Sequence, residues 1–301
     1  MRPTTALVLS LCCFGVLLIA GRGSAAARAP ASVTLSSGVS STRTTIPVSF
    51  NGRRASCVLD TGSSAIIVSP MLAREVGLTG EDGTFEVAPD GRSYADRETR
   101  IARLAVAGYT LRDVHALISS HLTGYSALCG YDFFMRFPTL INRRRNAVTL
   151  YPAPSKIAHM HCLPVNLKPR VPLARVEING TWLNQIVLDS GMAGGGALWD
   201  GVRLSLRNPL VSNTGYAINR AGFAGGFSCG GSAFVRFAPG TPASSMPMCT
   251  EEERPDGYNG IIETNLPSIH AMAVDYPHRR ICFDLASFSQ AWARFNNLRS
   301  P

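Results

Sequence analysis

With 301 residues, of which 46% are apolar and 16% charged, the chain can bury one or two hydrophobic cores and lacks the composition of a disordered protein. The formal net charge of +9 comes almost wholly from arginine, because Lys156 and Lys168 are the only lysines. The charges are scattered, and no helix-turn-helix, zinc-finger or RNA-binding signature accompanies them. We therefore expect a solvated basic surface and no nucleic-acid partner.

The amino-terminal end predicts an export signal followed by a leader. In residues 1–27, Arg2 precedes an apolar stretch, and residues 25–27 are small alanines suited to signal cleavage. An uncleaved anchor is the alternative, but the apolar stretch is short for a bilayer span, and no later segment is long enough. We expect a secreted or periplasmic protein with no stable membrane insertion after signal removal. Residues 28–44 are small and polar without periodicity, which predicts a flexible leader.

The first strong pattern, in residues 56–64, is a strand that ends in an acidic turn. An apolar run leads to Asp60, and Thr61 and Gly62 follow at once, so the chain is expected to turn where the acid lies. Residues 70–76 then predict a short helix.

Two further strands, at residues 84–87 and 100–106, predict a hairpin in the same half of the chain. Its turn residues are Pro89, Asp90 and Gly91, and Tyr94 lies near the turn but outside it. A plain surface hairpin is the simplest interpretation of this pattern.

The proline-rich region around residues 156–172 predicts a connection between two lobes. We expect an N-terminal lobe over residues 45–155 and a C-terminal lobe over residues 173–301. The cluster from His159 to Cys162 contains metal-ligand types, but no second cluster follows at useful spacing. We therefore expect no metal and no cofactor.

The C-terminal half repeats the pattern of the first. The apolar run and acidic turn return as Asp-Ser-Gly at residues 189–191, and an Asn-Gly hairpin signal precedes each acid, at residues 51–52 and 179–180. Downstream, the apolar-apolar-Gly motif at residues 128–130 corresponds to residues 261–263. Two long copies indicate two similar lobes, because a solenoid would repeat at a short period.

This pattern resembles the aspartic peptidase superfamily, which includes the pepsins and retropepsins. The shared motif is apolar-apolar-Asp-Thr/Ser-Gly, followed by apolar-apolar-Gly, and the resemblance covers residues 45–285. It implies a mainly β, bilobal acid-protease fold, with two pseudo-twofold-related, β-barrel-like lobes and a cleft between them. Each lobe has the size of a retropepsin subunit. The hairpin near residues 89–91 would then be the flap that closes over the substrate, with Tyr94 as a flap candidate.

The resemblance also assigns candidate site residues. Asp60 and Asp189 would be catalytic. Supporting residues would be Thr61, Gly62, Ser63, Gly130, Ser190 and Gly191. In the family, the hydroxyls at positions matching Thr61 and Ser190 make hydrogen bonds between the lobes, and the position matching Ser63 hydrogen-bonds the outer oxygen of its aspartate.

Two adjacent carboxyl groups suit peptide hydrolysis without a covalent intermediate. Because both cannot ionise cheaply at short distance, they share one proton. The ionised group takes a proton from water while the protonated group donates to the peptide carbonyl. The titration then belongs to the pair.

Six of the eight cysteines remain after signal removal, which permits three disulfides in an exported chain. The candidates are Cys57, Cys129, Cys162, Cys229, Cys249 and Cys282. The resemblance makes the strands of Cys57 and Cys129 neighbours, although two buried free thiols are the alternative. Pepsins also carry a bridge in the region that Cys249 and Cys282 flank.

Two residues of the second half depart from the family pattern. Met192 stands where a hydroxyl or small residue is expected, and Glu263 stands where Gly130 predicts glycine. The charged side chain of Glu263 must find a partner or distort the turn. The leading function is an exported, monomeric aspartic endopeptidase that acts on peptides or proteins. The alternatives are a non-catalytic module that binds extended peptides by strand addition, and an arginine-driven envelope or nucleic-acid binder.

Overall fold

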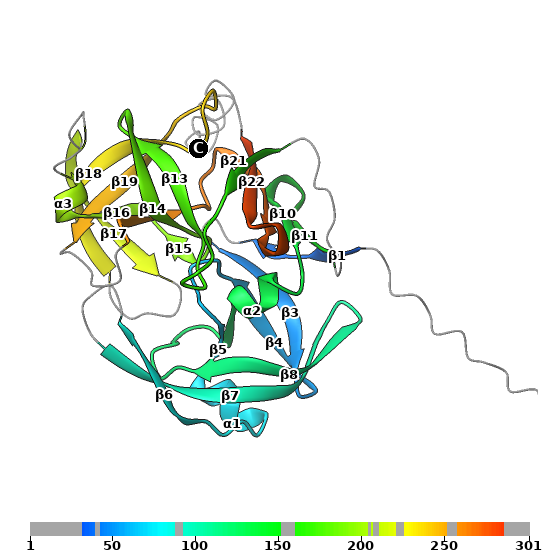
Figure 1. Cartoon of the computed structure of the whole chain (residues 1–301). Helices are drawn as coiled ribbons and strands as arrows, with labels where there is room; N and C mark the ends of the chain where they lie inside the picture. Colours follow the sequence, from blue (N-terminus) through cyan, green and yellow to red (C-terminus); the bar gives the residue numbers. More distant parts are fainter. Residues whose placement is uncertain are drawn as a thin grey trace, which may run out of the picture. The chain divides into compact units, whose positions relative to one another are not determined.

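The computed structural model describes residues 32–39, 43–87, 93–151, 160–203, 206, 211–220, 226–251 and 258–285 (Figure 1). All of them lie in one compact unit, Ala31–Pro301, whereas the predicted signal at residues 1–27 lies outside the described residues. The fold is mainly β, as the sequence predicts. The described helices are α1 (Pro70–Glu75), α2 (Tyr131–Phe134), η1 (Arg143–Arg145), α3 (Asp200–Arg203) and η2 (Tyr276–His278). None of them has the length and apolar character of a bilayer-crossing helix.

The first barrel closes on itself because its first and last strands pair. Around the barrel the strands are β3 (Thr44–Phe50), β4 (Arg53–Leu59), β9 (Ala127–Cys129), β5 (Ile66–Val68), β8 (Tyr109–Ile118) and β7 (Ser93–Val106). The β3–β7 pairing completes the ring. β2 (Gly38–Val39) extends the sheet beside β3, and β6 (Glu81–Val87) extends it beside β7.

The second barrel repeats this topology. Its ring consists of β13 (Leu173–Ile178), β14 (Thr181–Asp189), β20 (Gly260–Glu263), β16 (Gly196–Trp199), β19 (Ser244–Glu251) and β18 (Gly226–Arg236), closed by the β13–β18 pairing. β17 (Val211–Arg220) and β15 (Met192–Ala193) continue the sheet beyond β18. In each barrel the strand that leads to an aspartate pairs in parallel with a later strand, β4 with β9 and β14 with β20.

A third sheet joins the two halves of the chain. Its strand order is β1 (Val33–Ser36), β11 (Ala147–Leu150), β10 (Thr139–Asn142), β21 (Ile269–Asp275), β22 (Arg280–Leu285) and β12 (His161–Pro164). β10 and β21 come from different halves and pair antiparallel. Within residues 28–44, for which we expect a flexible leader, β1 pairs with β11 and β2 pairs with the start of β3, so the backbone groups of these strands have partners.

Local sequence explains the start of each barrel. Asn51 and Gly52 take φ of 48° and 96°, and Asn179 and Gly180 take φ of 48° and 80°. Such positive φ values at both turn positions suit a two-residue hairpin that follows strand twist. The two Asn-Gly signals thus form the β3–β4 and β13–β14 hairpins that lead to the two aspartates.

One continuous hydrophobic cluster runs through both barrels and the joining sheet. It includes Phe50 of β3, Val176 of β13 and Phe283 of β22, all fully buried. Because residues of both barrels and of the joining sheet belong to this cluster, the two aspartate-bearing strands share one core.

Two disulfides tie strands that lie near one another. Cys57–Cys129 connects β4 to β9, the neighbours that the resemblance implies, and Cys162–Cys282 connects β12 to β22. A bridge between Cys249 and Cys282 was therefore the wrong expectation, because the pairing of β12 with β22 places Cys162 opposite Cys282. Cys249 is also disulfide-bonded, and the side chain of Cys229 is outside the described residues.

Candidate active site

Asp60 and Asp189 occupy equivalent strand ends. Asp60 follows β4, and its N–H donates to the carbonyl of Cys129 in β9 over 3.1 Å. Asp189 closes β14, and its carbonyl accepts a hydrogen bond from Thr264, just after β20, over 2.9 Å. Because each aspartate is tied to the parallel neighbour of its own strand, its backbone position is set by the barrel.

Thr61 and Ser190 join the two acidic turns through four hydrogen bonds. The N–H of Thr61 donates to Oγ of Ser190 over 3.0 Å, and the N–H of Ser190 donates to Oγ1 of Thr61 over 2.9 Å. Each hydroxyl then donates to a strand carbonyl of the opposite half, Thr61 to Leu188 over 2.7 Å and Ser190 to Leu59 over 2.8 Å. These are the cross-lobe hydrogen bonds that the resemblance implies.

Gly62 and Gly191 allow each carboxyl group to pack against the opposite turn. A Cβ at position 62 would lie 2.5 Å from Cγ of Asp189, and a Cβ at position 191 would lie 2.2 Å from Cγ of Asp60. Real carbon atoms do not approach this closely, so both positions require glycine. The reciprocal contacts place the two carboxyl groups in neighbouring positions.

Backbone N–H groups orient both carboxyl groups. Oδ1 of Asp60 accepts from Gly62 over 2.9 Å, and Oδ1 of Asp189 accepts from Gly191 over 2.6 Å and from Met192 over 3.0 Å. Both side chains are largely buried, with residue exposures of 6% for Asp60 and 2% for Asp189.

Comparison with known proteins gives one family match, in the first half of the chain. Residues 46–136, which include the Asp60 turn, match the family described as gag-polyprotein putative aspartyl protease. This match supports a relationship to the aspartic peptidases over these residues. Among solved structures it is similar to a retropepsin-like aspartic protease from Rickettsia conorii, with 14% identity and a TM-score of 0.33, over 40% of this chain and 89% of that chain. A search of curated proteins gave no match.

Ser63 and Met192 follow the glycines of the two acidic turns. The hydroxyl of Ser63 donates to the carbonyl of Ala65 over 2.9 Å, so it stabilises its own turn, and its hydrogen bond to the outer oxygen of Asp60 stays a prediction. Met192 is fully buried in a small hydrophobic cluster with Val187 and Ile261. Its backbone N–H still serves Asp189, although its side chain offers no hydroxyl.

Gly130 and Glu263 occupy equivalent places in the two barrels, but only position 263 has room for a side chain. A Cβ at position 130 would lie 2.2 Å from the carbonyl oxygen of Ala65, so only glycine fits there. Glu263 pairs with Asp189 in the β14–β20 register. Its Oε2 accepts hydrogen bonds from Gly194 over 2.7 Å and Gly195 over 2.9 Å. The side chain has therefore found a partner without breaking the strand pairing.

Glu263 is a titratable group of the site itself. Its residue exposure is 6%, and burial raises the pKa of its carboxyl to about 7. The two glycine N–H groups and the positive charge of Arg143 lower this pKa, while the negative charge of Asp189 raises it. Burial outweighs the favourable hydrogen bonds, which is the usual result for a carboxyl group with partial compensation.

Tyr276 and Arg43 are site residues that the sequence reasoning missed. Tyr276, in η2, donates from its hydroxyl to the carbonyl of Thr61 over 3.3 Å. Burial, followed by the negative charges of Asp60 and Asp189, raises the pKa of Tyr276 well above its ordinary value. Arg43, in the expected leader, donates to the carbonyl of Gly191 over 2.8 Å. No local pattern marks either residue, because both contacts span more than a hundred residues of sequence.

The flap candidates are only partly described. Pro89, Asp90 and Gly91 lie outside the described residues. The β6–β7 hairpin that leads toward them is formed, with Tyr94 of β7 opposite Glu86 of β6. The hairpin is therefore present, and the role of its tip remains a prediction.

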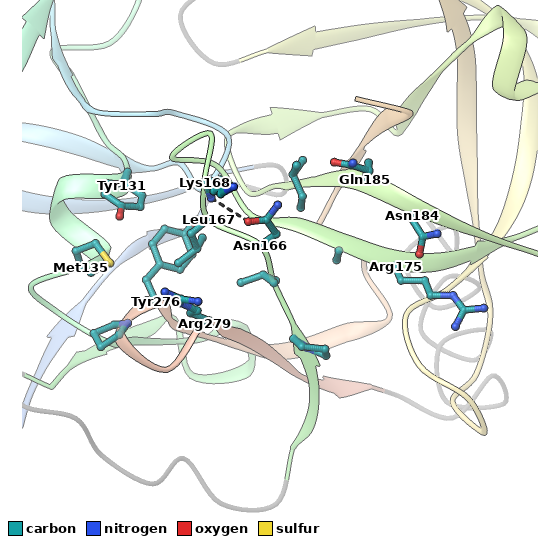
Figure 2. Close-up of a pocket in the computed structure, with 15 residues that line it drawn as sticks. Tyr131, Met135, Asn166, Leu167, Lys168, Arg175, Asn184, Gln185, Tyr276 and Arg279 are labelled. Carbon is teal, nitrogen blue, oxygen red and sulfur yellow. Dashed lines mark hydrogen bonds between the residues drawn. The ribbon is translucent and has the colours of Figure 1, made fainter. Parts of the chain in front are cut away.

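A cavity of about 980 Å³ lies near η2 and β14, and Figure 2 shows the residues that line it. Tyr276 and Arg279 line it together with Lys168, Arg175 and Gln185, which gives the lining a basic character. Neither Asp60 nor Asp189 lines this cavity among the described residues. Tyr276 connects the two places, because its ring lines the cavity while its hydroxyl contacts Thr61.

Proposed function

We propose that the chain is an exported aspartic endopeptidase that hydrolyses peptide bonds with Asp60 and Asp189. The reciprocal packing of each carboxyl group against the opposite glycine carries this proposal. Both acids come from a single chain, so a monomer suffices. The proposed lobes are residues 45–155 and 173–301, connected through residues 156–172, and no cofactor enters the reaction.

In the proposed reaction, a water bound between the carboxyl groups attacks the peptide carbonyl carbon. The ionised aspartate takes a proton from this water, and the protonated aspartate donates its proton to the carbonyl oxygen. Collapse of the tetrahedral intermediate breaks the C–N bond, and the amine leaves after it receives a proton from the dyad. The four hydrogen bonds between Thr61 and Ser190 and the opposite strands support this proposal, because they fix the separation of the two acids.

Two disulfides fit an extracellular or periplasmic protein, because such bonds persist in oxidising compartments. We propose that residues 1–27 direct the chain there as a signal. A test is whether the exported protein begins after residue 27. An intact amino terminus on the exported protein would count against signal cleavage.

A non-catalytic peptide-binding module is the second candidate, favoured by the absence of a hydroxyl at Met192. Such a module would add an extended peptide to a strand edge without cutting it. Incubation of the mature protein with a diverse peptide library across a pH series separates the two functions. Cleavage that the transition-state mimic pepstatin inhibits supports the peptidase, whereas peptide retention without any cleavage supports the binding module.

A further inference from the structure

The loop after Asp189 is shaped around the side chain of Glu263. In the first barrel, the carbonyl of Ala65 fills the space beside Gly130. In the second barrel, Gly194 and Gly195 adopt φ of 104° and 135°, values that other residues rarely take. This conformation turns both N–H groups toward Oε2 of Glu263. The glutamate and the two glycines therefore form one structural unit that the first barrel lacks.

This unit is directly linked to the hydrogen bonds of Asp189. The N–H of Glu263 also donates to the carbonyl of Gly195 over 2.9 Å, so three hydrogen bonds tie β20 to the loop. Two residues earlier than Gly194, Met192 donates its N–H to Oδ1 of Asp189. A change in the hydrogen bonds between Glu263 and the loop therefore acts close to the Met192 hydrogen bond that orients Asp189.

Among the residues that the structure describes, two charged groups act on Glu263. On β14 the facing carboxyl group is Asp189, and from η1 the facing cation is Arg143. Arg143 is itself held by Asn265, to whose carbonyl it donates over 2.8 Å. The other strands that flank the loop, β15 and β16, contain no titratable side chain. Arg143 and Asp189 are therefore the charged groups that act on Glu263, and Asp189 is the carboxyl group of the two, placed opposite Glu263 by the strand register.

We propose that Glu263 is a positioning residue and the third titrating carboxyl group of the site, coupled to the Asp60–Asp189 pair. Its ionised form holds the N–H groups of Gly194 and Gly195 most strongly and adds a negative charge beside Asp189. That charge makes loss of the pair's shared proton harder, which extends activity toward higher pH. By reciprocity, the charge on Asp189 makes ionisation of Glu263 harder. The catalytic part of this inference rests on the proposed peptidase function, and the coupling itself does not.

The coupling is tested by stability measurements that need no activity. Thermal unfolding is recorded from pH 4 to pH 9 for the wild type, Glu263→Gln, Asp189→Asn and the double variant. A carboxyl pKa that is raised by folding stabilises the protein below its unfolded value and loses this contribution as pH rises through its folded value. We expect a fall in the melting temperature toward neutral pH that Glu263→Gln lacks. In the Asp189→Asn background this fall should move to lower pH.

Two results would overturn the coupling. The first is a melting temperature that depends on pH in the same way in the wild type and in Glu263→Gln. The second is a fall in melting temperature that occurs at the same pH in the wild type and in Asp189→Asn. Glu75→Gln, at an exposed carboxyl on α1, controls for loss of one charge. Should Glu263→Gln not fold, carboxyl-carbon NMR of wild-type protein labelled at glutamate decides the matter. We expect one glutamate to titrate near neutral pH, and the absence of such a resonance would refute the proposal.

The catalytic consequence is read from pH profiles of kcat/KM. In Glu263→Gln the alkaline limb should move to lower pH by on the order of one unit, while kcat/KM at acid pH stays near the wild-type value, because the side chain is uncharged there in both proteins. Superimposable profiles would contradict the effect on the dyad. Complete absence of cleavage by the wild type would contradict the proposed function, and the stability series would still decide whether Glu263 and Asp189 are coupled.

Discussion

Thr61 and Ser190 exchange hydrogen bonds between each N–H and the other residue's hydroxyl, at 3.0 and 2.9 Å. Each residue thus acts as the acceptor that the other turn needs. The two turns also carry Asp60 and Asp189. The hydrogen bonds between Thr61 and Ser190 therefore fix the positions of the two aspartates relative to each other.

Removal of the Thr61 hydroxyl should destabilise the protein and lower its activity together. In Thr61→Val, the buried N–H of Ser190 loses its acceptor and the carbonyl of Leu188 loses a donor. We expect a loss of about 1–3 kcal/mol in the free energy of unfolding, measured by urea titration. Thr149→Val is the matched control, because it removes an exposed hydroxyl pair with Thr34. Equal losses in both variants would contradict the role given to Thr61.

A methyl group at either acidic turn should collide with the opposite aspartate. Gly62→Ala would place a carbon 2.5 Å from Cγ of Asp189. A shift of about 1 Å at reacting groups costs on the order of 100-fold, so we expect kcat/KM to fall by about that factor or more. Gly201→Ala, in α3, meets nothing within 4 Å and should leave kcat/KM unchanged. Wild-type kinetics in Gly62→Ala would show that the acids do not pack as described.

The two described disulfides should differ in their effect on activity. Loop closure predicts a loss of about 4 kcal/mol in the free energy of unfolding when the Cys57–Cys129 bridge, with its sequence separation of 72, is removed. Because this bridge joins β4 to β9 beside Asp60, the double alanine variant should also lose activity in its folded fraction.

The double alanine variant at Cys162 and Cys282 is the natural comparison. It removes a bridge in the joining sheet and should lower stability while it leaves kcat/KM of the folded protein close to wild type. Unfolding followed by circular dichroism and kinetics below the transition measure the two effects separately. Equal loss of kcat/KM in both double variants would contradict a specific role for the β4–β9 bridge.

Tyr276 should make the fold sensitive to alkaline pH. Its folded pKa is raised, mainly by burial, so its stabilising contribution is complete below the unfolded value of about 10 and declines as pH rises above it. Tyr276→Phe should cost about 1 kcal/mol near neutral pH, because the hydrogen bond to Thr61 is lost. The variant should also show a shallower decline of the melting temperature above pH 10. Tyr131→Phe, at the neighbouring ring, is the control, and identical alkaline curves for the two variants would contradict this account.

The sequence predicts those parts of the site that depend on local pattern. The Asn-Gly hairpins, the apolar strands and the Asp-Thr-Gly and Asp-Ser-Gly turns are each encoded within about ten residues, and their duplication indicates that the two turns face each other. The departure at Glu263 is also visible as a break in the repeat. The hydrogen-bond partners of Glu263 cannot be predicted from the sequence, because Gly194 and Gly195 are about seventy residues away. Their N–H groups reach Glu263 only through the conformation of the loop.

Contacts between distant segments account for what the sequence did not predict. Arg43 lies in a stretch without periodicity, and it is ordered by pairing of neighbouring residues and by its contact with Gly191. The partner of Cys162 depends on the register of β12 against β22, which the sequence pattern of either strand leaves open. The hydroxyl of Ser63 donates to the carbonyl of Ala65, two residues further along the chain, which is a local hydrogen bond that competes with longer-range partners.

The most direct test of the account is peptide cleavage by Asp60→Asn and Asp189→Asn alongside the wild type, with each variant shown to be folded by its thermal unfolding. We predict that either substitution abolishes hydrolysis, because the remaining carboxyl group has no partner with which to share a proton. Full activity in one of the two variants would contradict a shared pair of aspartates as the catalytic centre.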